Sequence, residues 1–274
     1  MGLSFFTHYA INQVDSGRFK TVEEAFRHCS DKGLKYGDLL GRLDEYPMYM
    51  HCEMLRDAGI KPQCLIYCRN FAAFDEKERK ANLSFYKEHI DLMDKMDIRL
   101  LMAAPGIPLY KTEEDVKRAQ AYEIEGFIEL VEYAKGAGIT VAMENQSMHA
   151  RGDSYIDDVK YILDSVPGLM YILDSGNFWC VGEDMLKACD MFMDKIVNVH
   201  CKDWKIIPYG EFIRSNIPPF TGAPIGAGVL PLEELGKKLK ENGYKGNVTL
   251  EINSPVTGEE FDESIEFMRR VFSV

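Results

Sequence analysis

Thr140-Val141-Ala142-Met143-Glu144 is a short apolar run that ends in a side chain able to hold a metal ion. Three later runs share this design: Tyr171-Ile172-Leu173-Asp174, Ile196-Val197-Asn198-Val199-His200 and Val248-Thr249-Leu250-Glu251. Each run has the length of a buried parallel strand, and helix-like stretches separate them. In a parallel α/β barrel the carboxyl ends of the strands meet at one face, where sites are built. The four runs therefore predict such a barrel, with two Glu, one Asp and one His gathered at one end.

The donor set expected at that end is rich in carboxylate oxygen and has one imidazole. Such a hard set suits Mn²⁺, Mg²⁺ or Co²⁺ better than it suits a structural zinc ion. Each residue alone has an ordinary explanation: a buried Glu paired with a cation, an Asx turn at Asp174, or a satisfied core His200. Four of them in consecutive units predict one metal site, with Glu144, Asp174, His200 and Glu251 as ligands.

The alternation of strand-like and helix-like segments repeats eight times along the chain. The first strand is expected at residues 3–7, and the first helix at Thr21, which forms a capping box with Glu24. The last strand is expected at 248–250, followed by a closing helix over 259–272. Right-handed crossovers repeated in this way predict a single (β/α)₈ TIM barrel over residues 1–274. The alternative, a doubly wound dinucleotide fold, lacks its Gly-x-Gly-x-x-Gly turn after the first strand.

The segment at about 204–228 breaks this regularity. It is rich in proline and glycine and has no helical stripe. A loop this long is uncommon unless it is functional. Because it follows His200 so closely, we expect it to cover the site.

Composition narrows the classes of function. The 274 residues are 46% hydrophobic, enough for a large core, and the formal net charge of −12 argues against a nucleic-acid partner. No apolar stretch is long enough to span a membrane, and the first residues lack the features of a signal peptide. Seven cysteines, an odd number with no Cys-x-x-Cys pair, favour a reduced, cytoplasmic protein.

Several segments also carry the motifs of a known family. These are Met143-Glu144-Asn145, Leu173-Asp174-Ser175-Gly176-Asn177, Val199-His200-Cys201-Lys202-Asp203, Leu250-Glu251-Ile252, Gly226-Ala227-Gly228 and Gly33-Leu34-Lys35-Tyr36-Gly37-Asp38. They resemble the xylose isomerase-like TIM barrels, in particular the sugar phosphate isomerase/epimerase group with its ketose 3-epimerases and inosose dehydratases. The resemblance implies one divalent ion on the four ligands, Mn²⁺ first, with Mg²⁺, Co²⁺ or Zn²⁺ as alternatives.

By the same resemblance, Glu144 and Glu251 flank the substrate carbon as acid and base. The expected activity is isomerisation or epimerisation of a ketose, polyol or sugar phosphate by proton abstraction next to a carbonyl, through an enediolate. A metal ion that holds adjacent oxygens acts as a Lewis acid and stabilises the enediolate. The expected partner is therefore a small sugar or polyol, and a homo-oligomer is left open.

Seven residues are expected to contact the substrate: His8, Asp38, Arg69, His149, Asn177, Lys202 and Trp204. Lys202 has the same strand parity as His200, so it would hold a substrate oxygen or phosphate, unless it pairs with Asp203 or another acid. His8 and His149 would be general acids or ligands, or else solvated loop residues. Trp204 would wall a sugar pocket or cap the barrel core.

Three other functions fit the same barrel. They are a sugar or inosose dehydratase, the catalytic subunit of a partner-dependent carbon-glycoside-cleaving enzyme, and a non-catalytic sugar-binding barrel. Asn177 stands where ketose 3-epimerases of the usual pattern, and the related endonuclease IV, carry a His. Asp38 and Arg69-Asn70 stand where that nuclease has further His ligands. Together with the acidic charge, these departures argue against a trinuclear nuclease.

Overall fold

The computed structural model describes residues 1–40, 48–105, 110–148, 151–208, 219–253 and 255–273. Its main feature is a closed barrel of parallel strands in the order β1-β10-β7-β6-β5-β4-β3-β2. The barrel strands are β1 (Gly2–Phe6), β2 (Tyr36–Leu40), β3 (Lys61–Cys68), β4 (Leu100–Ala104), β5 (Thr140–Glu144), β6 (Met170–Asp174), β7 (Ile196–Cys201) and β10 (Asn247–Leu250). The predicted (β/α)₈ barrel is thereby confirmed.

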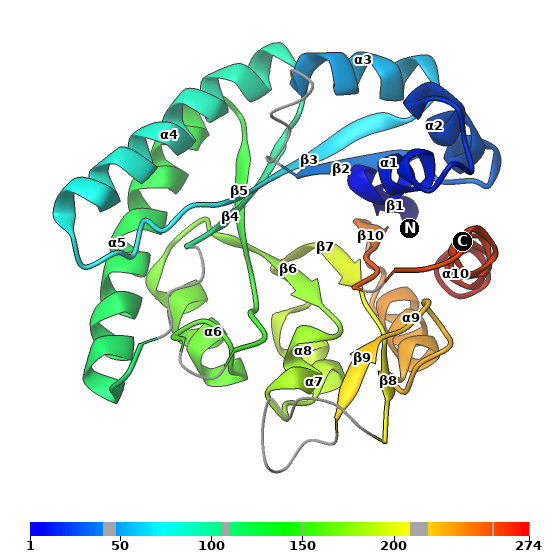
Figure 1. The fold of residues 1–274 in the computed structure, drawn as a ribbon. Helices are drawn as coiled ribbons and strands as arrows, with labels where there is room; N and C mark the ends of the chain where they lie inside the picture. Colours follow the sequence, from blue (N-terminus) through cyan, green and yellow to red (C-terminus); the bar gives the residue numbers. More distant parts are fainter. Residues whose placement is uncertain (41–47, 106–109, 149–150, 209–218, 254, 274) are drawn as a thin grey trace.

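Helices form an outer layer around these strands (Figure 1). They are α1 (Thr7–Asp15), α2 (Val22–Asp31), α3 (Met48–Asp57), α4 (Glu76–Lys95), α5 (Glu113–Gly136), α6 (Ile156–Ser165), α7 (Asn177–Cys180), α8 (Met185–Phe192), α9 (Leu232–Glu241) and α10 (Gly258–Phe272). Side-chain oxygens cap the first turns of five of them: Thr21, Asp75, Thr112, Asp184 and Thr257. Most of the apolar core lies between this layer and the outward faces of the strands.

Strand register sets which residues share a level at the carboxyl end of the barrel. Asp174 of β6 pairs with His200 of β7, and Thr249 of β10 pairs with the same His200. Because side chains alternate between the two faces of a strand, Glu251 lies on the same side as Thr249 and one level further along. The register therefore brings Asp174, His200 and Glu251 to the inside of the barrel mouth.

The inside of the barrel is divided into an apolar part and a polar part. Beneath His200, Asp38 Oδ1 accepts a hydrogen bond from Ser4 Oγ (2.9 Å), and its Oδ2 accepts from Asn198 Nδ2 (3.0 Å) and Thr249 Oγ1 (2.8 Å). These four residues are fully buried. The apolar part consists of Phe6, Cys64, Ile66, Leu100, Met102, Ala104, Ala142 and Ile172. The polar part thus supports one side of the site from below.

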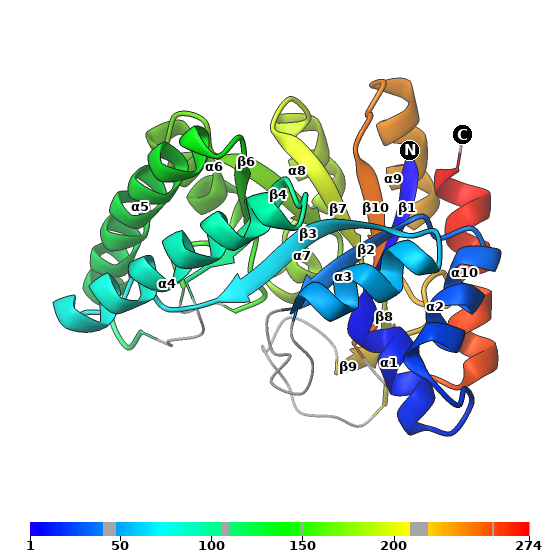
Figure 2. The same ribbon diagram turned by 90° about the horizontal axis from the view of Figure 1, so that it is seen from above.

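Two segments differ from the sequence prediction. The chain forms α1 directly after β1, whereas the sequence predicted no element between the first strand and Thr21. The buried face of α1 consists of Thr7, Ala10 and Gln13, so a pattern of large apolar residues is missing there. Within 204–228 the chain forms an antiparallel hairpin of β8 (Trp204–Ile206) and β9 (Phe220–Gly222), with residues 209–218 outside the described part. Figure 2 shows α1 and this hairpin at the same end of the barrel.

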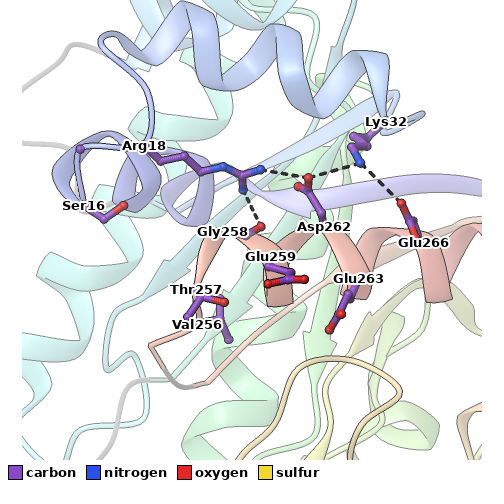
Figure 3. A pocket seen from close by; sticks show the side chains of 11 residues that line it. Ser16, Arg18, Lys32, Val256, Thr257, Gly258, Glu259, Asp262, Glu263 and Glu266 are labelled. Carbon is purple, nitrogen blue, oxygen red and sulfur yellow. Dashed lines mark hydrogen bonds and ion pairs between the residues drawn. The ribbon is translucent and has the colours of Figure 1, made fainter.

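A charged clasp joins the first and last parts of the chain, whose termini lie close together in both views (Figures 1 and 2). At its centre Asp262 of α10 contacts Arg18 (2.9 Å) and Lys32 (3.3 Å), as Figure 3 shows. Asp262 also contacts His28 of α2 (2.8 Å). Arg18 also donates a hydrogen bond to the carbonyl oxygen of Gly258 (2.7 Å). These contacts hold α2 against α10 where the barrel closes.

In the described part of the chain, no helix is both long and apolar enough to cross a membrane. The longest helix, α5, has 24 residues but carries charged side chains along its length.

The clasp predicts a pH-dependent contribution to stability. Burial favours the neutral acid, but hydrogen bonds from His28 and Arg18 outweigh it and hold the pKa of the Asp262 carboxyl below its usual value. The carboxylate therefore stabilises the fold above the unfolded-state pKa of about 3.9, and this contribution is lost as the pH falls through the folded-state pKa. We expect Asp262→Asn to lower the free energy of unfolding by about 1–2 kcal/mol at pH 7.

Urea unfolding of the wild type and of Asp262→Asn across the acid range measures this difference, which should shrink below about pH 4. Glu266→Gln is the matched control, because its side chain is 63% exposed and contacts Lys32 at 3.5 Å. Its effect should stay below about 0.5 kcal/mol. An equal loss in both variants would mean that the clasp is not centred on Asp262.

Candidate metal centre

The four side chains that the sequence places together do lie together. One donor atom from each of Glu144, Asp174, His200 and Glu251 lies within 4.8 Å of the others. They come from β5, β6, β7 and the end of β10, which are consecutive neighbours in the barrel. Glu144, Asp174 and His200 are buried, and Glu251 is half-buried. This is a compact set of three carboxylates and one imidazole.

The imidazole of His200 is held between carboxylates on both sides. Its Nδ1 contacts Glu144 Oε1 and lies 3.5 Å from Glu251 Oε2. Its Nε2 lies 3.7 Å from Asp38 Oδ2, and the ring of Phe6 packs edge-on against it. Burial opposes the charged imidazolium, but Glu144 and Asp38 outweigh it and raise the pKa of His200 well above its usual value. Nδ1 is therefore the nitrogen that faces the cluster, and Asp38 orients the ring from behind.

Lys202 supplies positive charge to the same cluster. Its Nζ lies 2.8 Å from Asp174 Oδ2, 3.0 Å from Glu251 Oε1 and 3.1 Å from Asn177 Oδ1. Only 5% of this side chain is exposed. Burial disfavours the ammonium, but Asp174 and Glu251 outweigh it and raise the pKa of Lys202. The side chain thus points to the site, as its parity predicts, and the acids that it pairs with are two of the expected ligands.

The sequence leaves two roles open for Asp174, an Asx turn and a metal ligand, and its two carboxylate oxygens fit one role each. Its Oδ1 accepts hydrogen bonds from the backbone N–H groups of Gly176 and Asn177, both at 2.8 Å, which forms an Asx turn. Its Oδ2 faces Lys202. One oxygen therefore shapes the loop after β6, while the other remains directed at the cluster.

Asp203 organises the next loop instead of pairing with Lys202. It accepts backbone hydrogen bonds from Gly226 (3.0 Å), Gly228 (2.9 Å) and Leu230 (3.2 Å). A Cβ on Gly228 would lie 2.1 Å from Asp203 Oδ1, so glycine is required there for this close approach. The Gly-x-Gly segment is thereby explained as the partner of this carboxylate.

Trp204 is buried and joins two loops of the site. Its Nε1 donates a hydrogen bond to the carbonyl oxygen of Gly176 (2.9 Å), and its ring packs edge-on against Phe220 of β9. The indole thus ties the loop after β6 to the β8–β9 hairpin. Its contact with a substrate stays a prediction.

The remaining expected substrate contacts occupy different surroundings. His8 lies in α1, with its ring centroid 3.9 Å from that of Tyr9. Arg69 is exposed, and its guanidinium lies over the ring of Phe85 on α4. Asp38 is enclosed in the polar network inside the barrel. His149 lies outside the described residues.

Tyr9 is a site residue that the sequence did not single out. Burial, and then the charge of Glu251, raise the pKa of its phenol well above the usual value, and the backbone of Ile252 is a further neighbour. Tyr9 reaches this position because α1 starts immediately after β1. The signal that could have found it is its adjacency to His8 at the end of the first strand.

The family assignment follows from the sequence as a whole. The family model of the xylose isomerase-like TIM barrel matches residues 19–271. The chain therefore belongs to this family.

Individual relatives agree with this membership. An inosose isomerase of Halalkalibacterium halodurans is 24% identical over 259 residues, which cover 89% of this chain and 87% of that protein. The solved structure of the IOLI protein with a bound zinc atom has a TM-score of 0.76 at 19% identity, with all of both chains covered. A D-psicose 3-epimerase solved in the presence of D-fructose has a TM-score of 0.75 at 16% identity, again with full coverage of both chains. The structures show the fold, and the relatives support an enzyme of this family.

The residues present fit a divalent metal ion. The set has oxygen and nitrogen donors at mutual distances that one ion can bridge. Glu251 Oε2 is buried and accepts no hydrogen bond from the described residues, so it is available as a ligand atom. Glu144, Asp174, His200 Nδ1 and Glu251 would hold the ion, while Asp38 would orient the imidazole as an outer partner.

We expect Asp174→Asn to lower the affinity for Mn²⁺ by about 100-fold or more, because loss of even an outer-shell partner costs about 10–100-fold. Titration calorimetry of the metal-free protein with Mn²⁺, Mg²⁺, Co²⁺ and Zn²⁺ measures this change and ranks the ions. Circular dichroism of the metal-free variant provides the fold control, because the substitution also removes a carboxylate partner of the buried Lys202 ammonium.

Asp190→Asn is the control, because Asp190 is an exposed carboxylate that pairs with Lys238 on the outer surface. It should bind the ion as the wild type does. Unchanged affinity in Asp174→Asn would show that the ion is held elsewhere.

Proposed function

We propose that the protein is a divalent-metal-dependent sugar isomerase or epimerase that removes a proton from a carbon next to a carbonyl. The observation that carries the proposal is the meeting of two glutamates at one imidazole. Glu144, from β5, and Glu251, after β10, both approach Nδ1 of His200. Two carboxylates around one space can serve as base on one face of a substrate carbon and as acid on the other. The inosose isomerase among the relatives supports the reaction class.

The ion would act as a Lewis acid on the carbonyl and hydroxyl oxygens of the substrate. We infer Mn²⁺, because three carboxylates and one imidazole form a hard donor set, with Mg²⁺, Co²⁺ and Zn²⁺ as alternatives.

Lys202 and Asn177 are proposed to hold substrate oxygens beside Glu251. Asp174, Glu251 and Asn177 surround the Lys202 ammonium and fix its position, and together they take its three N–H groups. A substrate oxygen would replace one of these acceptors when Asp174 and Glu251 turn to the ion. Glu251 must take up and release a proton during the reaction. The positive charge of Lys202 beside it favours the ionised form of this carboxylate. Asn177 Nδ2 donates to the carbonyl oxygen of Asn145 (2.9 Å), so its amide is oriented as well.

The other expected contacts divide by position. His8 and Trp204, with His149, are proposed to line the substrate space at the barrel mouth. Arg69, which lies over Phe85, is proposed to contact only a substrate that extends to α4. For Asp38 we propose a positioning role, because protein donors already surround both of its carboxylate oxygens.

A dehydratase is the second candidate, because it would share the first step. Removal of the same proton, followed by loss of a neighbouring hydroxyl group as water, needs the same metal and the same two glutamates. The products separate the two reactions: an isomer retains all its hydroxyl groups, whereas the lyase leaves a dehydrated ketone.

Glu251→Gln is expected to reduce turnover by about 10³-fold or more, because the amide cannot accept the proton and general base catalysis contributes up to about 10⁴-fold. The assay incubates a panel of ketoses, aldoses and inososes in D₂O with the metal-loaded protein. The sugars are then separated from the protein, and proton NMR measures the loss of carbon-bound hydrogen and any new epimer. Glu144→Gln should behave in the same way if the two carboxylates act as a pair.

The exposed Glu259, in the first turn of α10, provides the control Glu259→Gln, which should keep wild-type turnover. Circular dichroism and Mn²⁺ titration of both site variants separate loss of chemistry from loss of fold or metal. Wild-type exchange in Glu251→Gln would exclude Glu251 as acid or base. Absence of exchange in metal-loaded wild type, across the panel, would remove the support for an isomerase.

A further inference from the structure

A hollow of about 420 Å³ lies between α1 and the segment that follows β10. Tyr9 and Gln13 line it from α1, and Ile252, Asn253, Pro255 and Val256 line it from the other side. Strands β1 and β10 are hydrogen-bonded neighbours, and both lining segments begin at the carboxyl ends of these strands. Since Ile252 directly follows Glu251, the hollow lies beside the proposed reaction centre.

Gln13, which lines this hollow, has a buried side-chain oxygen without a hydrogen-bond donor in the part of the chain that the structure describes. The residue is 5% exposed, yet its Oε1 accepts no hydrogen bond from the described residues. A buried amide oxygen without a donor costs free energy, and a ligand hydroxyl group would supply that donor. The lone acceptor therefore points to a ligand with hydroxyl groups.

The chemistry of the lining restricts the ligand further. Its described residues include no Lys, Arg, Asp or Glu, and the polar groups are amides and hydroxyls. A phosphate would find no cationic partner there, whereas a neutral polyhydroxyl group would find acceptors and donors. Tyr9, Pro255 and Val256 add apolar surface of the kind that packs against the C–H face of a sugar ring.

A second hollow, of about 860 Å³, has a different character. Arg18, Lys32, Asp262 and Glu266 line it, and these side chains satisfy one another in the charged clasp (Figure 3). Glu259 and Glu263 also line it, so the described lining is acidic overall, and its cations, Arg18 and Lys32, are already paired with acids. An acidic surface of this kind does not by itself indicate a ligand.

We propose that the hollow at Gln13 is a subsite for a neutral sugar ring attached to the reacting sugar, so that the substrate is a keto-disaccharide or similar glycoside. Gln13 Oε1 is closed to solvent in this structure, so its amide turns toward the hollow to accept a hydrogen bond from a hydroxyl group of that ring. Tyr9 forms the wall shared with the reaction centre. For the sugar that reacts, the inference rests on the proposed function. It adds that the group attached to this sugar is a second, neutral sugar ring.

The test compares D-fructose with three fructose disaccharides linked through O3, O4 and O6, namely turanose, lactulose and isomaltulose. Saturation-transfer NMR with the protein loaded with diamagnetic Mg²⁺ measures each Kd as binding, so the readout does not depend on turnover. At least one disaccharide should bind about tenfold tighter than fructose. Gln13→Leu should lower this ratio of Kd values about tenfold, which is the effect of one lost hydrogen bond. Asp15→Asn, on the same helix and outside the lining, should leave the ratio of the Kd values unchanged.

Asn253→Trp provides an independent variant in case Gln13→Leu does not fold. Asn253 is exposed at the rim, so the indole should fill the hollow and abolish the preference for the disaccharide without disturbing the core. The subsite is overturned if no disaccharide binds more tightly than fructose, or if both variants keep the wild-type preference.

The D₂O exchange assay separates this inference from the proposed function. Exchange with free fructose together with no disaccharide preference would retain the isomerase and reject the subsite. Binding of a disaccharide that depends on Gln13, with no exchange on any sugar, would retain the subsite and reject the isomerase.

Discussion

Three carboxylates share one buried space at the mouth of this barrel, and their mutual repulsion constrains everything around them. Like charges brought out of water are costly unless positive charge is close. The chain itself supplies Lys202, which contacts two of the acids, and His200, whose pKa the acids raise. A divalent ion held by the cluster would add the rest of the positive charge. The same repulsion that makes this cluster unfavourable alone therefore makes it selective for a cation.

The barrel interior is arranged to hold this cluster in place. Asp38, fixed by hydrogen bonds from Ser4, Asn198 and Thr249, lies behind His200 and determines which imidazole nitrogen faces the carboxylates. Metal-binding histidines are commonly oriented by an outer carboxylate, because that contact fixes the tautomer and the direction of the ring. The polar side of the core therefore serves the site, while the apolar side fills the barrel.

Much of the fold and of the metal cluster could be predicted from local patterns. Four apolar runs of strand length predicted β5, β6, β7 and β10, and the residues that end them meet as expected. The patterns failed where burial is achieved by small or polar residues, as in α1, whose buried face is Thr7, Ala10 and Gln13. The hollow at Gln13 could not be predicted without that helix, and the only sequence signal for Tyr9 was its adjacency to His8.

The sequence by itself determined the donor types, their order along the chain and their parity on the strands, because a period of two residues decides which face a side chain takes. Only the tertiary structure decided which distant groups meet. Lys202 pairs with Asp174 and Glu251 instead of Asp203, because closure of the barrel brings the ends of β6, β7 and β10 together. Asp203 turns to the glycines at 226 and 228 for the same reason. Such partnerships join residues far apart in the chain, and only packing in three dimensions selects among them.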